Sequence, residues 1–282
     1  MADKALSEVV ARALAEDLGD GDVTSQATVS EGARGRARIV QKAPGVVFGL
    51  EAVAETMRQC GVEDVDDLVV EGQWREEVPA EVTLTSGPAR GLLAAERTAL
   101  NFLGHLSGIA TLTARFAEEV AGTGAQILDT RKTTPGLRAL EKAAVAAGGG
   151  QNHRLGLYDA ILIKENHIAL AGGVAKAIHA ARAAQPRMAV EIECRDVEEA
   201  AYALGAGAER LLLDNMDTET LREAVKLRDS EVGSSPPTLE ASGGITLENV
   251  CEFAETGVDY ISVGALTHSA SALDFSMLLE SA

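Results

Sequence analysis

The sequence contains few aromatic residues, few cysteines and no long apolar run. Aromatic residues make up 3% of its 282 residues, too few to suggest a protein that stacks nucleic-acid bases on its side chains. The cysteines, Cys60, Cys194 and Cys251, match no metal-binding spacing and are typical of a reduced, intracellular protein. No apolar run approaches the roughly 18 residues that a membrane helix needs. These absences predict a cytoplasmic protein that binds neither nucleic acid nor membrane.

Positive charge is scarce over most of the chain and concentrated in one segment. In total, 25 Lys and Arg stand against 43 Asp and Glu, which gives a formal net charge of −18. This balance again disfavours nucleic acid and anionic membranes as partners. Between residues 131 and 164 the balance reverses, because only Glu141 and Asp159 are acidic there. The basic residues of this segment are Arg131, Lys132, Arg138, Lys142, Arg154 and Lys164. Such a segment in an anionic protein predicts a small anionic ligand.

The second half of the chain has a regular series of short apolar runs. They are centred near Ile127, Ile161, Val190, Leu212, Leu239 and Ile261, and the lengths between them suit strand–helix–strand units. This predicts an irregular or incomplete α/β barrel of about six parallel strands over residues 109–267. Residues 1–108 lack the series and predict an N-terminal α+β sandwich domain. The tail, residues 268–282, has a helical apolar pattern and is expected to pack on that domain.

Local patterns predict the individual elements. Helices are expected at residues 6–18, 49–60, 92–120, 136–147, 170–184, 197–204, 218–227 and 247–255, the last behind Thr246 as its N-cap. Short strands are expected at residues 36–43 and 46–48, and residues 74–86 alternate around Pro79 as an antiparallel strand pair would.

Each apolar run of the second half ends on a residue suited to an anion, a metal or a ribose. The carboxyl ends of parallel barrel strands share one mouth, so these residues should gather around one pocket. They are Arg131 with Lys132, Lys164, Glu193, Asp214, Ser242-Gly243-Gly244 and Gly264. Strand ends border polar loops in any protein, so one such end would mean little. Six in succession, with both signs of charge, predict a site.

The last two strand ends predict a phosphate site. Ser242-Gly243-Gly244 precedes a helix, and Gly264 is followed by His268. Glycines let the backbone approach an anion, and amides at a helix N-terminus can bind it. A tight turn would explain either loop alone, but the pair occupies the place where α/β barrels commonly bind a phosphate. The sequence has no dinucleotide fingerprint and no P-loop.

Other strand ends predict carboxylate and metal or ribose contacts. Arg131 and Arg154 offer planar forks that match carboxylates. His153 is interpreted as an anion contact rather than a proton shuttle, because the adjacent cation should lower its pKa. Glu193 and Asp214 could bind Mg²⁺ directly or through water, accept bonds from ribose hydroxyls, or neutralise lysines. Glu191 ranks behind Glu193 as a candidate.

Eight stretches spread in order over nearly the whole chain carry a resemblance to a known family. They are Glu16–Ser25, Glu96–Asn101, Asp129–Pro135, Gly148–Arg154, Leu162–His167, Val190–Cys194, Leu213–Met216 and Glu240–Gly244. Together they resemble the quinolinate phosphoribosyltransferases, which are type II phosphoribosyltransferases of NAD biosynthesis. The segments around Arg131-Lys132 and His153-Arg154 are the most specific.

The resemblance implies transfer of a phosphoribosyl group from 5-phosphoribosyl-1-pyrophosphate to quinolinate with Mg²⁺, giving nicotinate mononucleotide, pyrophosphate and CO₂. It implies a homodimer or a multiple of dimers, in which Arg97 reaches the site of the partner subunit. The catalytic residues it implies are Lys132, Lys164, Glu193 and Asp214, the last two also contacting the metal directly or through water. The substrate-binding residues it implies are Arg97, Thr130, Arg131, His153, Arg154, Ser242, Gly243, Gly244, Gly264 and His268.

Three other interpretations remain open from the residues alone. A related phosphoribosyltransferase could act on nicotinate or another aromatic acid without decarboxylation, although a single carboxylate does not call for so dense a cationic cluster. A barrel aldolase could use Lys164 in a Schiff base. A non-catalytic anion-binding protein would leave the pair Glu193 and Asp214 unexplained.

Overall fold

The computed structural model describes residues 2–230 and 236–282, which form two compact units. The first unit comprises three stretches, up to Ala114, Thr134–Gly149 and from Ser269 onward. The second comprises Arg115–Thr133 and Gly150–His268. Within the part of the chain that the structure describes, every helix is too short or too polar to reach across a lipid bilayer.

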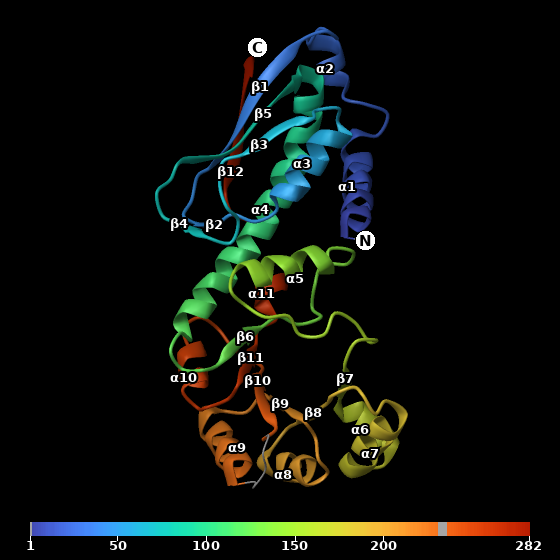
Figure 1. Cartoon of the computed structure of the whole chain (residues 1–282), viewed down its shortest axis with the longest axis vertical. Helices are drawn as coiled ribbons and strands as arrows, with labels where there is room; N and C mark the ends of the chain where they lie inside the picture. Colours follow the sequence, from blue (N-terminus) through green and yellow to red (C-terminus); the bar gives the residue numbers. More distant parts are fainter. Residues whose placement is uncertain (1, 231–235) are drawn as a thin grey trace. The chain divides into compact units, whose positions relative to one another are not determined.

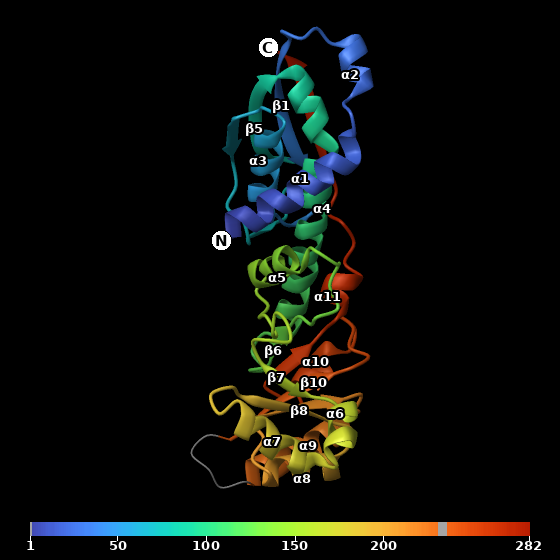
Figure 2. The ribbon, with the colours of Figure 1, turned by 90° about the vertical axis from the view of Figure 1, so that its right-hand side faces the viewer.

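The first unit is built on an antiparallel sheet with helices packed against it (Figure 1). The strand order is β12 (Phe275–Ser281), β1 (Arg34–Gln41), β5 (Ala80–Pro88) and β3 (Asp64–Asp67). The unit also contains α1 (Ala2–Leu18), α2 (Val23–Thr28), α3 (Leu50–Gln59), α5 (Arg138–Ala147) and most of α4 (Ala89–Glu119). Residues Ile39, Val53, Met57, Leu92 and Leu103, none of them exposed, form the core between the sheet and helices α3 and α4. Helix α1 packs on α3, as Figure 2 shows from the side.

The C-terminal tail completes this sheet as a strand, so the expected helix there is wrong. β12 pairs antiparallel with β1, with Met277 opposite Ile39. Leu273, Phe275 and Met277 alternate with polar residues, and this period of two outweighs the helical spacing to Leu278. Before the strand, the tail passes close to α4, where Leu273 N donates to Gly104 O at 2.9 Å. A Cβ on Gly108 would clash with Ser271 O, so glycine permits this approach.

Two other expectations for the first unit also need correction. The expected pair around Pro79 does not form, because β4 (Trp74–Arg75) pairs with β2 (Gly45–Val46) instead. β5 lies between β1 and β3, and β3 itself was not anticipated. Its sequence, Asp64-Val65-Asp66-Asp67, is polar because it forms an edge strand with little burial.

The second unit is an open barrel of parallel strands, as the sequence predicted. Its six-stranded sheet has the order β6 (Gln126–Leu128), β11 (Tyr260–Ser262), β10 (Thr238–Ser242), β9 (Arg210–Asp214), β8 (Val190–Cys194) and β7 (Ile161–Ile163). Each strand neighbours the next in sequence except β6 and β7, which form the two edges. Gln151 makes a single parallel bridge to Leu128 beside the β6 edge.

Two of the expected helices of the second unit differ from those in the structure. The expected helix over residues 170–184 is two helices, α6 (Glu165–Ala171) and α7 (Val174–Ala184). Gly172 and Gly173 separate them with φ of +80° and +127°. The expected helix behind Thr246 begins later, as α10 (Val250–Ala254), because Asn249 Oδ1 accepts from Thr246 N in a turn. Helices α8 (Val197–Gly205), α9 (Thr218–Ser230) and α11 (Ala265–His268) complete the unit.

Candidate active site

A cavity of about 210 Å³ opens among the carboxyl ends of the second unit's strands. Its lining comes from the ends of β7, β9, β10 and β11 and from the loops that follow β6. Eight predicted site residues line it: Thr130, Arg131, Lys132, His153, Arg154, Lys164, Asp214 and Ser242. Leu162, Leu212, Glu240 and Ser262 complete the lining. The structure therefore gathers most of the predicted site around one pocket.

The loop after β6 is held so that Lys132 meets the loop after β11. Thr130 Oγ1 accepts from Lys132 N at 3.0 Å, and Thr267 Oγ1 donates to Lys132 O at 2.8 Å. A Cβ placed on Gly264 would lie 3.2 Å from Lys132 Cδ and 3.1 Å from His268 Nε2. Gly264, Lys132 and His268 thus come together, as expected for a shared phosphate site.

A buried carboxylate, that of Asp129, holds the backbone of the His153-Arg154 loop in place. Asp129, which is fully buried, accepts from His153 N at 2.8 Å. The pKa of Arg154 is lowered by its burial and then by the charge of Arg131. Two guanidinium groups that repel each other at the edge of a cavity favour an anion between them.

His153 is held by two buried acids, Glu191, which the sequence ranked behind Glu193, and Glu240, which it did not single out. Its Nε2 lies 3.0 Å from Glu191 Oε2 and 3.5 Å from Glu240 Oε2, while Nδ1 accepts from Arg154 N at 2.7 Å. Burial lowers the pKa of His153, but the hydrogen bond with Glu191 and the charge of Glu240 outweigh burial and raise it. The expectation of a lowered pKa was therefore wrong. Protonation of Nδ1 would nevertheless break the bond from Arg154 N.

Arg210 joins the same buried cluster. Its Nε lies 3.5 Å from both Glu191 Oε1 and Glu240 Oε2, and its guanidinium stacks 3.9 Å from the ring centre of Tyr260. His153, Glu191 and Glu240 offer ligand atoms within 4.8 Å of one another. A guanidinium beside both carboxylates already supplies the positive charge that a metal ion would bring, so we interpret the group as an ionic cluster rather than a metal centre.

The two acids of the cluster titrate differently. Burial, followed by the charge of Glu191, raises the pKa of Glu240 to about 8. For Glu191, burial acts in the same direction, but the hydrogen bond with His153 outweighs it and lowers the pKa. Glu240 therefore holds its proton to a higher pH than an ordinary carboxyl group does. In the part of the chain that the structure describes, neither oxygen of Glu240 meets a hydrogen-bond donor at normal geometry. A proton shared with Glu191 supplies the missing bond between the two carboxyl groups.

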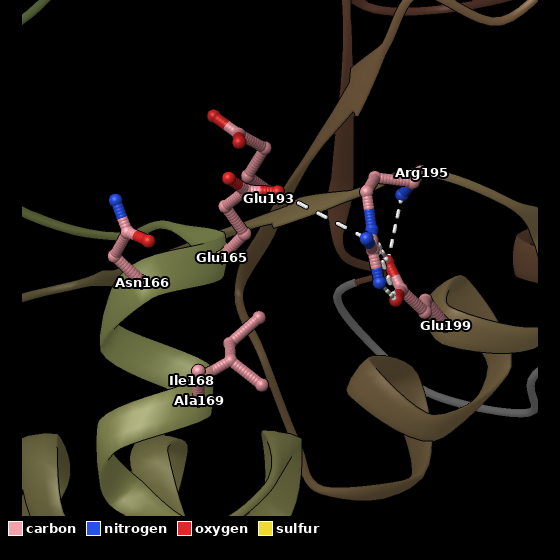
Figure 3. A pocket seen from close by; sticks show the side chains of 7 residues that line it. All are labelled: Glu165, Asn166, Ile168, Ala169, Glu193, Arg195 and Glu199. Carbon is pink, nitrogen blue, oxygen red and sulfur yellow. Dashed lines mark hydrogen bonds and ion pairs between the residues drawn. The ribbon is translucent and has the colours of Figure 1, made fainter.

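Glu193 does not line this cavity but adjoins it through Lys164, whose ammonium it binds. Figure 3 shows Glu193 at a neighbouring hollow of about 400 Å³, together with Glu165 of α6. Across that hollow, Arg195 pairs with Glu199 of α8 (Figure 3). Lys164 also begins α6, since its N–H donates to His167 Nδ1 at 2.9 Å.

Asp214 and the Ser242 loop form one interlocked corner. Asn215 N donates to Ser242 O at 2.8 Å, and Asn215 Nδ2 donates to Asp214 Oδ2 at 2.8 Å. Asn215 has a φ of +55°, a strained value for a residue with a side chain. Gly243, with φ of +102°, lies so close to Asn215 Oδ1 that a Cβ there would clash.

Two remaining predicted residues lie outside this corner. Gly244, with φ of +64°, accepts from Asn249 Nδ2 at 3.1 Å through its carbonyl. Arg97 belongs to the first unit, where it is an exposed residue of α4.

Models of one family match almost the whole chain. The C-terminal domain of quinolinate phosphoribosyl transferase matches residues 109–278, and the N-terminal domain matches residues 22–107. Nicotinate-nucleotide pyrophosphorylase [carboxylating] of Mycobacterium leprae is 45% identical over 97% of this chain and 96% of that protein. Quinolinate phosphoribosyltransferase [decarboxylating] 2b of Nicotiana tabacum, which is mitochondrial, is 40% identical over 98% of this chain and 82% of that protein.

A solved structure agrees with these matches. The nicotinate-nucleotide pyrophosphorylase of Francisella tularensis superposes with a TM-score of 0.92 over 98% of this chain and 96% of that chain, at 36% identity.

Proposed function

This chain belongs to the quinolinate phosphoribosyltransferase family, and we propose that it joins quinolinate to 5-phosphoribosyl-1-pyrophosphate with loss of CO₂. The products are nicotinate mononucleotide, pyrophosphate and CO₂, which makes the protein a pentosyltransferase of NAD biosynthesis. One observation carries the proposal beyond the family match. Five basic side chains converge on a single small cavity: Arg131, Lys132, His153, Arg154 and Lys164. That density suits a ligand with two carboxylates beside a phosphorylated one.

Each basic residue has a role that follows from its place. Arg131 and Arg154, whose charges repel each other, bind the carboxylates of quinolinate through planar forks. Lys164, at the end of β7, adds a mobile charge. Both nitrogens of His153 already face protein groups, so His153 supports the wall beside Arg154 and contacts quinolinate mainly through its ring.

The phosphates bind on the other side of the cavity. Lys132 lies against Gly264 and His268, and Thr130 holds the backbone of Lys132 in place. Ser242, Gly243 and Gly244 offer backbone amides in a turn that Asn215 fixes. This pairing of two glycine loops supports binding of the 5-phosphate and the pyrophosphate of the donor.

The transfer step then needs placement of charge rather than a base. The quinolinate nitrogen has a free lone pair and attacks the anomeric carbon as pyrophosphate leaves, through an oxocarbenium-like ribose. Asp214 in the cavity and Glu193 beside Lys164 stabilise that positive charge and accept bonds from ribose hydroxyls. Holding the reactants in line supplies much of the remaining acceleration.

Mg²⁺ is proposed as the cofactor, held mainly by the donor's phosphates. Oxygen donors are what the ion prefers, and the site offers the carboxylates of Asp214 and Glu193. One oxygen of Asp214 accepts from Asn215, and one oxygen of Glu193 accepts from Lys164, which leaves the second oxygen of each for water or metal. When bound, the ion neutralises the charge of the leaving pyrophosphate.

Loss of CO₂ needs no further cofactor. Once its nitrogen is alkylated, the ring is a pyridinium, and the electron pair left by the departing carboxylate at C2 is stabilised by the adjacent positive nitrogen. Arg131, Arg154 and Lys164 hold the other carboxylate while this happens.

Assembly as a homodimer, or a multiple of one, and a cytoplasmic location are proposed as well. Arg97 is an exposed residue of α4 and is proposed to enter the partner's cavity. Complementation tests this. Arg97→Ala and Arg131→Ala variants, each inactive alone, should regain about a quarter of wild-type activity when mixed and re-associated, because half of the dimers would then carry one intact site. No recovery, together with a dimer in solution, would place Arg97 in its own subunit's site or outside both.

The three cysteines are free, as in a reducing compartment, which supports the proposed cytoplasmic location.

The proposed function is tested by assaying purified protein with the phosphoribosyl donor, Mg²⁺ and either quinolinate or nicotinate. Nicotinate mononucleotide and CO₂ should appear together from quinolinate and not from nicotinate. Product from nicotinate alone would assign a non-decarboxylating activity. Product from neither, with carbonyl substrates trapped on Lys164 by borohydride, would assign the aldolase reaction.

A further inference from the structure

The decarboxylation step requires a proton that none of the roles above supplies. Breaking the bond between C2 and its carboxylate releases CO₂ and leaves the electron pair on C2. Nicotinate mononucleotide carries hydrogen at that carbon, so one proton must reach C2 before product leaves. Either water or a side chain of the cavity can protonate C2. A side chain that does so must line the cavity and carry a proton at neutral pH.

Glu240 meets both conditions by its place. It lies in the middle of β10 and lines the cavity with Arg131, His153 and Arg154, yet it has no exposed surface. Within residues 2–230 and 236–282, neither of its carboxyl oxygens meets a hydrogen-bond donor of normal geometry. An ionised acid in that position would repel a ligand with two carboxylates, whereas a protonated acid can donate to it.

We propose, on the basis of the proposed function, that Glu240 is the acid that protonates C2 after CO₂ leaves. The O–H bond of the Glu240 carboxyl breaks, its proton forms the new C2–H bond with the electron pair left by the carboxylate, and Glu240 is left as a carboxylate. Solvent returns the proton when product departs. The sum is one quinolinate mononucleotide and one proton giving one nicotinate mononucleotide and one CO₂.

The groups around Glu240 favour this cycle. Burial and then the charge of Glu191 of β8 raise its pKa, while His153, on the loop before β7, and Arg210 of β9 lower it. Tyr260 of β11 faces Arg210 with its ring. After the transfer, His153 and Arg210, each with a nitrogen 3.5 Å from Glu240 Oε2, stabilise the new carboxylate. His153 and Arg210 also limit the rise in the pKa of Glu240, so that Glu240 can still release its proton to C2.

Four cationic side chains of the cavity are worse placed as proton donors. Arginine does not lose its proton in proteins, which removes Arg131 and Arg154. The ammonium group of Lys164 donates a hydrogen bond to Glu193. If Lys164 lost its proton, it would no longer bind the anionic substrate. Lys132 lies against Gly264 and His268 in the phosphate half of the cavity.

A single-turnover experiment with Glu240→Gln tests the proposal. Enzyme in excess over quinolinate is mixed with the phosphoribosyl donor and Mg²⁺, then quenched over time, and pyrophosphate, quinolinate mononucleotide, nicotinate mononucleotide and CO₂ are measured. Glutamine keeps the shape and neutrality of the protonated acid but has no acidic proton. Pyrophosphate should form at nearly the wild-type rate, nicotinate mononucleotide about 10²-fold more slowly, and quinolinate mononucleotide should accumulate. Glu255→Gln, on an exposed residue after α10, is the matched control.

The outcomes separate this proposal from the function on which it rests. Wild-type protein that releases no pyrophosphate from quinolinate contradicts the function itself. Wild-type turnover with a Glu240→Gln variant that forms nicotinate mononucleotide as fast as pyrophosphate overturns only the role of Glu240, and assigns the proton to a lysine or to water. A variant that misfolds moves the test to wild type, where the decarboxylation rate must fall as pH rises through the pKa of Glu240 while pyrophosphate formation does not follow it. A decarboxylation rate without that fall overturns the proposal.

Discussion

Glu141 in the first unit and Glu240 in the second are both fully buried, and they differ in what their oxygens meet. Glu141 Oε1 lies 2.8 Å from His105 Nε2, and Oε2 accepts from Thr134 N at 3.1 Å. Among the described residues, Glu240 has ion contacts of 3.5 Å to His153 and Arg210, and it shares a proton with Glu191. Burial raises the pKa of both, but hydrogen bonds to His105 and Thr134 outweigh burial in Glu141 and lower its pKa. The pKa of Glu240 stays raised.

This difference distinguishes a structural acid from a functional one. A buried carboxylate with a donor on each oxygen has its charge satisfied and stabilises the fold. A buried carboxylate that lacks donors and borders a cavity costs stability, and such groups concentrate at functional sites. The charges of the second unit's cavity should therefore matter to ligands more than to folding, whereas the reverse should hold in the first unit.

The largest effect is expected from Arg131→Ala. Removing a guanidinium that binds a carboxylate should lower kcat/KM for quinolinate by roughly 100-fold or more, equivalent to about 3 kcal/mol. Relief of its repulsion with Arg154 should leave the free energy of unfolding almost unchanged. Steady-state kinetics and urea unfolding measure the two. Arg36→Ala, on an exposed residue of β1, is the control and should change neither. A loss of stability that matches the loss of activity would mean that Arg131 belongs to the fold.

Glu141→Ala should lower the free energy of unfolding and leave kcat/KM almost unchanged, the opposite of Arg131→Ala. It leaves His105 Nε2 and Thr134 N without their acceptor, which should cost about 2–3 kcal/mol of unfolding free energy. Glu141→Gln, which retains one acceptor oxygen, should cost less. Urea unfolding gives both values, and equal losses in the two variants would show that packing rather than hydrogen bonding explains the burial of Glu141.

Stability as a function of pH should separate the two acids. The pKa of Glu240 is raised from 4.5 to about 8 on folding, so its stabilising contribution is present at low pH and is lost as pH rises through the folded value. Wild type should therefore lose at least about 1 kcal/mol relative to Glu240→Gln between pH 6 and pH 8.5. The pKa of Glu141 is lowered, so its contribution to the free energy of unfolding is already complete below pH 6 and stays constant from pH 6 to pH 8.5. Urea unfolding at both pH values is the measurement, and parallel losses in variant and wild type would contradict the raised pKa.

A pair of glycine substitutions should give the smallest effects. Gly61 and Gly243 both have positive φ, of +77° and +102°, but only Gly243 has a neighbour, Asn215, in the way of a Cβ. Backbone strain should cost each alanine variant about 1 kcal/mol of stability. Gly243→Ala should cost more than Gly61→Ala, because its Cβ also clashes with Asn215. Only Gly243→Ala should raise KM for the phosphoribosyl donor, by several-fold. Equal KM values in the two variants would remove the Ser242 loop from the phosphate site.

The strand ends were predictable because their pattern is local. Apolar runs of strand length, each followed by a polar residue, place Lys132, Lys164 and Asp214 at one edge of a parallel sheet without further information. The open barrel follows from the same spacing. The first unit was harder, because the pairing of β1 with β12 joins distant segments and the polar edge strand β3 has no apolar signal.

Arg210 and Glu240 of the buried cluster were missed, and Glu191 was ranked low, because all three lie inside strands. Glu191, Arg210 and Glu240 interrupt apolar runs, and in a barrel alternate strand residues face the interior. Glu191 pairs laterally with Arg210, and Glu240 lies on the next strand. Charged residues at inward-facing positions of three adjacent strands indicate a buried ionic cluster. The sequence shows this pattern only once the register of the strands is known. The pKa of His153 could not be predicted without these partners.

The pairing of β1 with β12 has a consequence for biosynthesis. A ribosome releases β1 early, yet the strand that covers its outer edge is made only after everything from residue 42 to residue 274 has emerged. Until then, β1 exposes a row of unsatisfied amides and carbonyls along that edge, where a second nascent chain could pair. The first unit is thus begun first and completed last, and the outer edge of β1 needs protection during translation until β12 pairs with it.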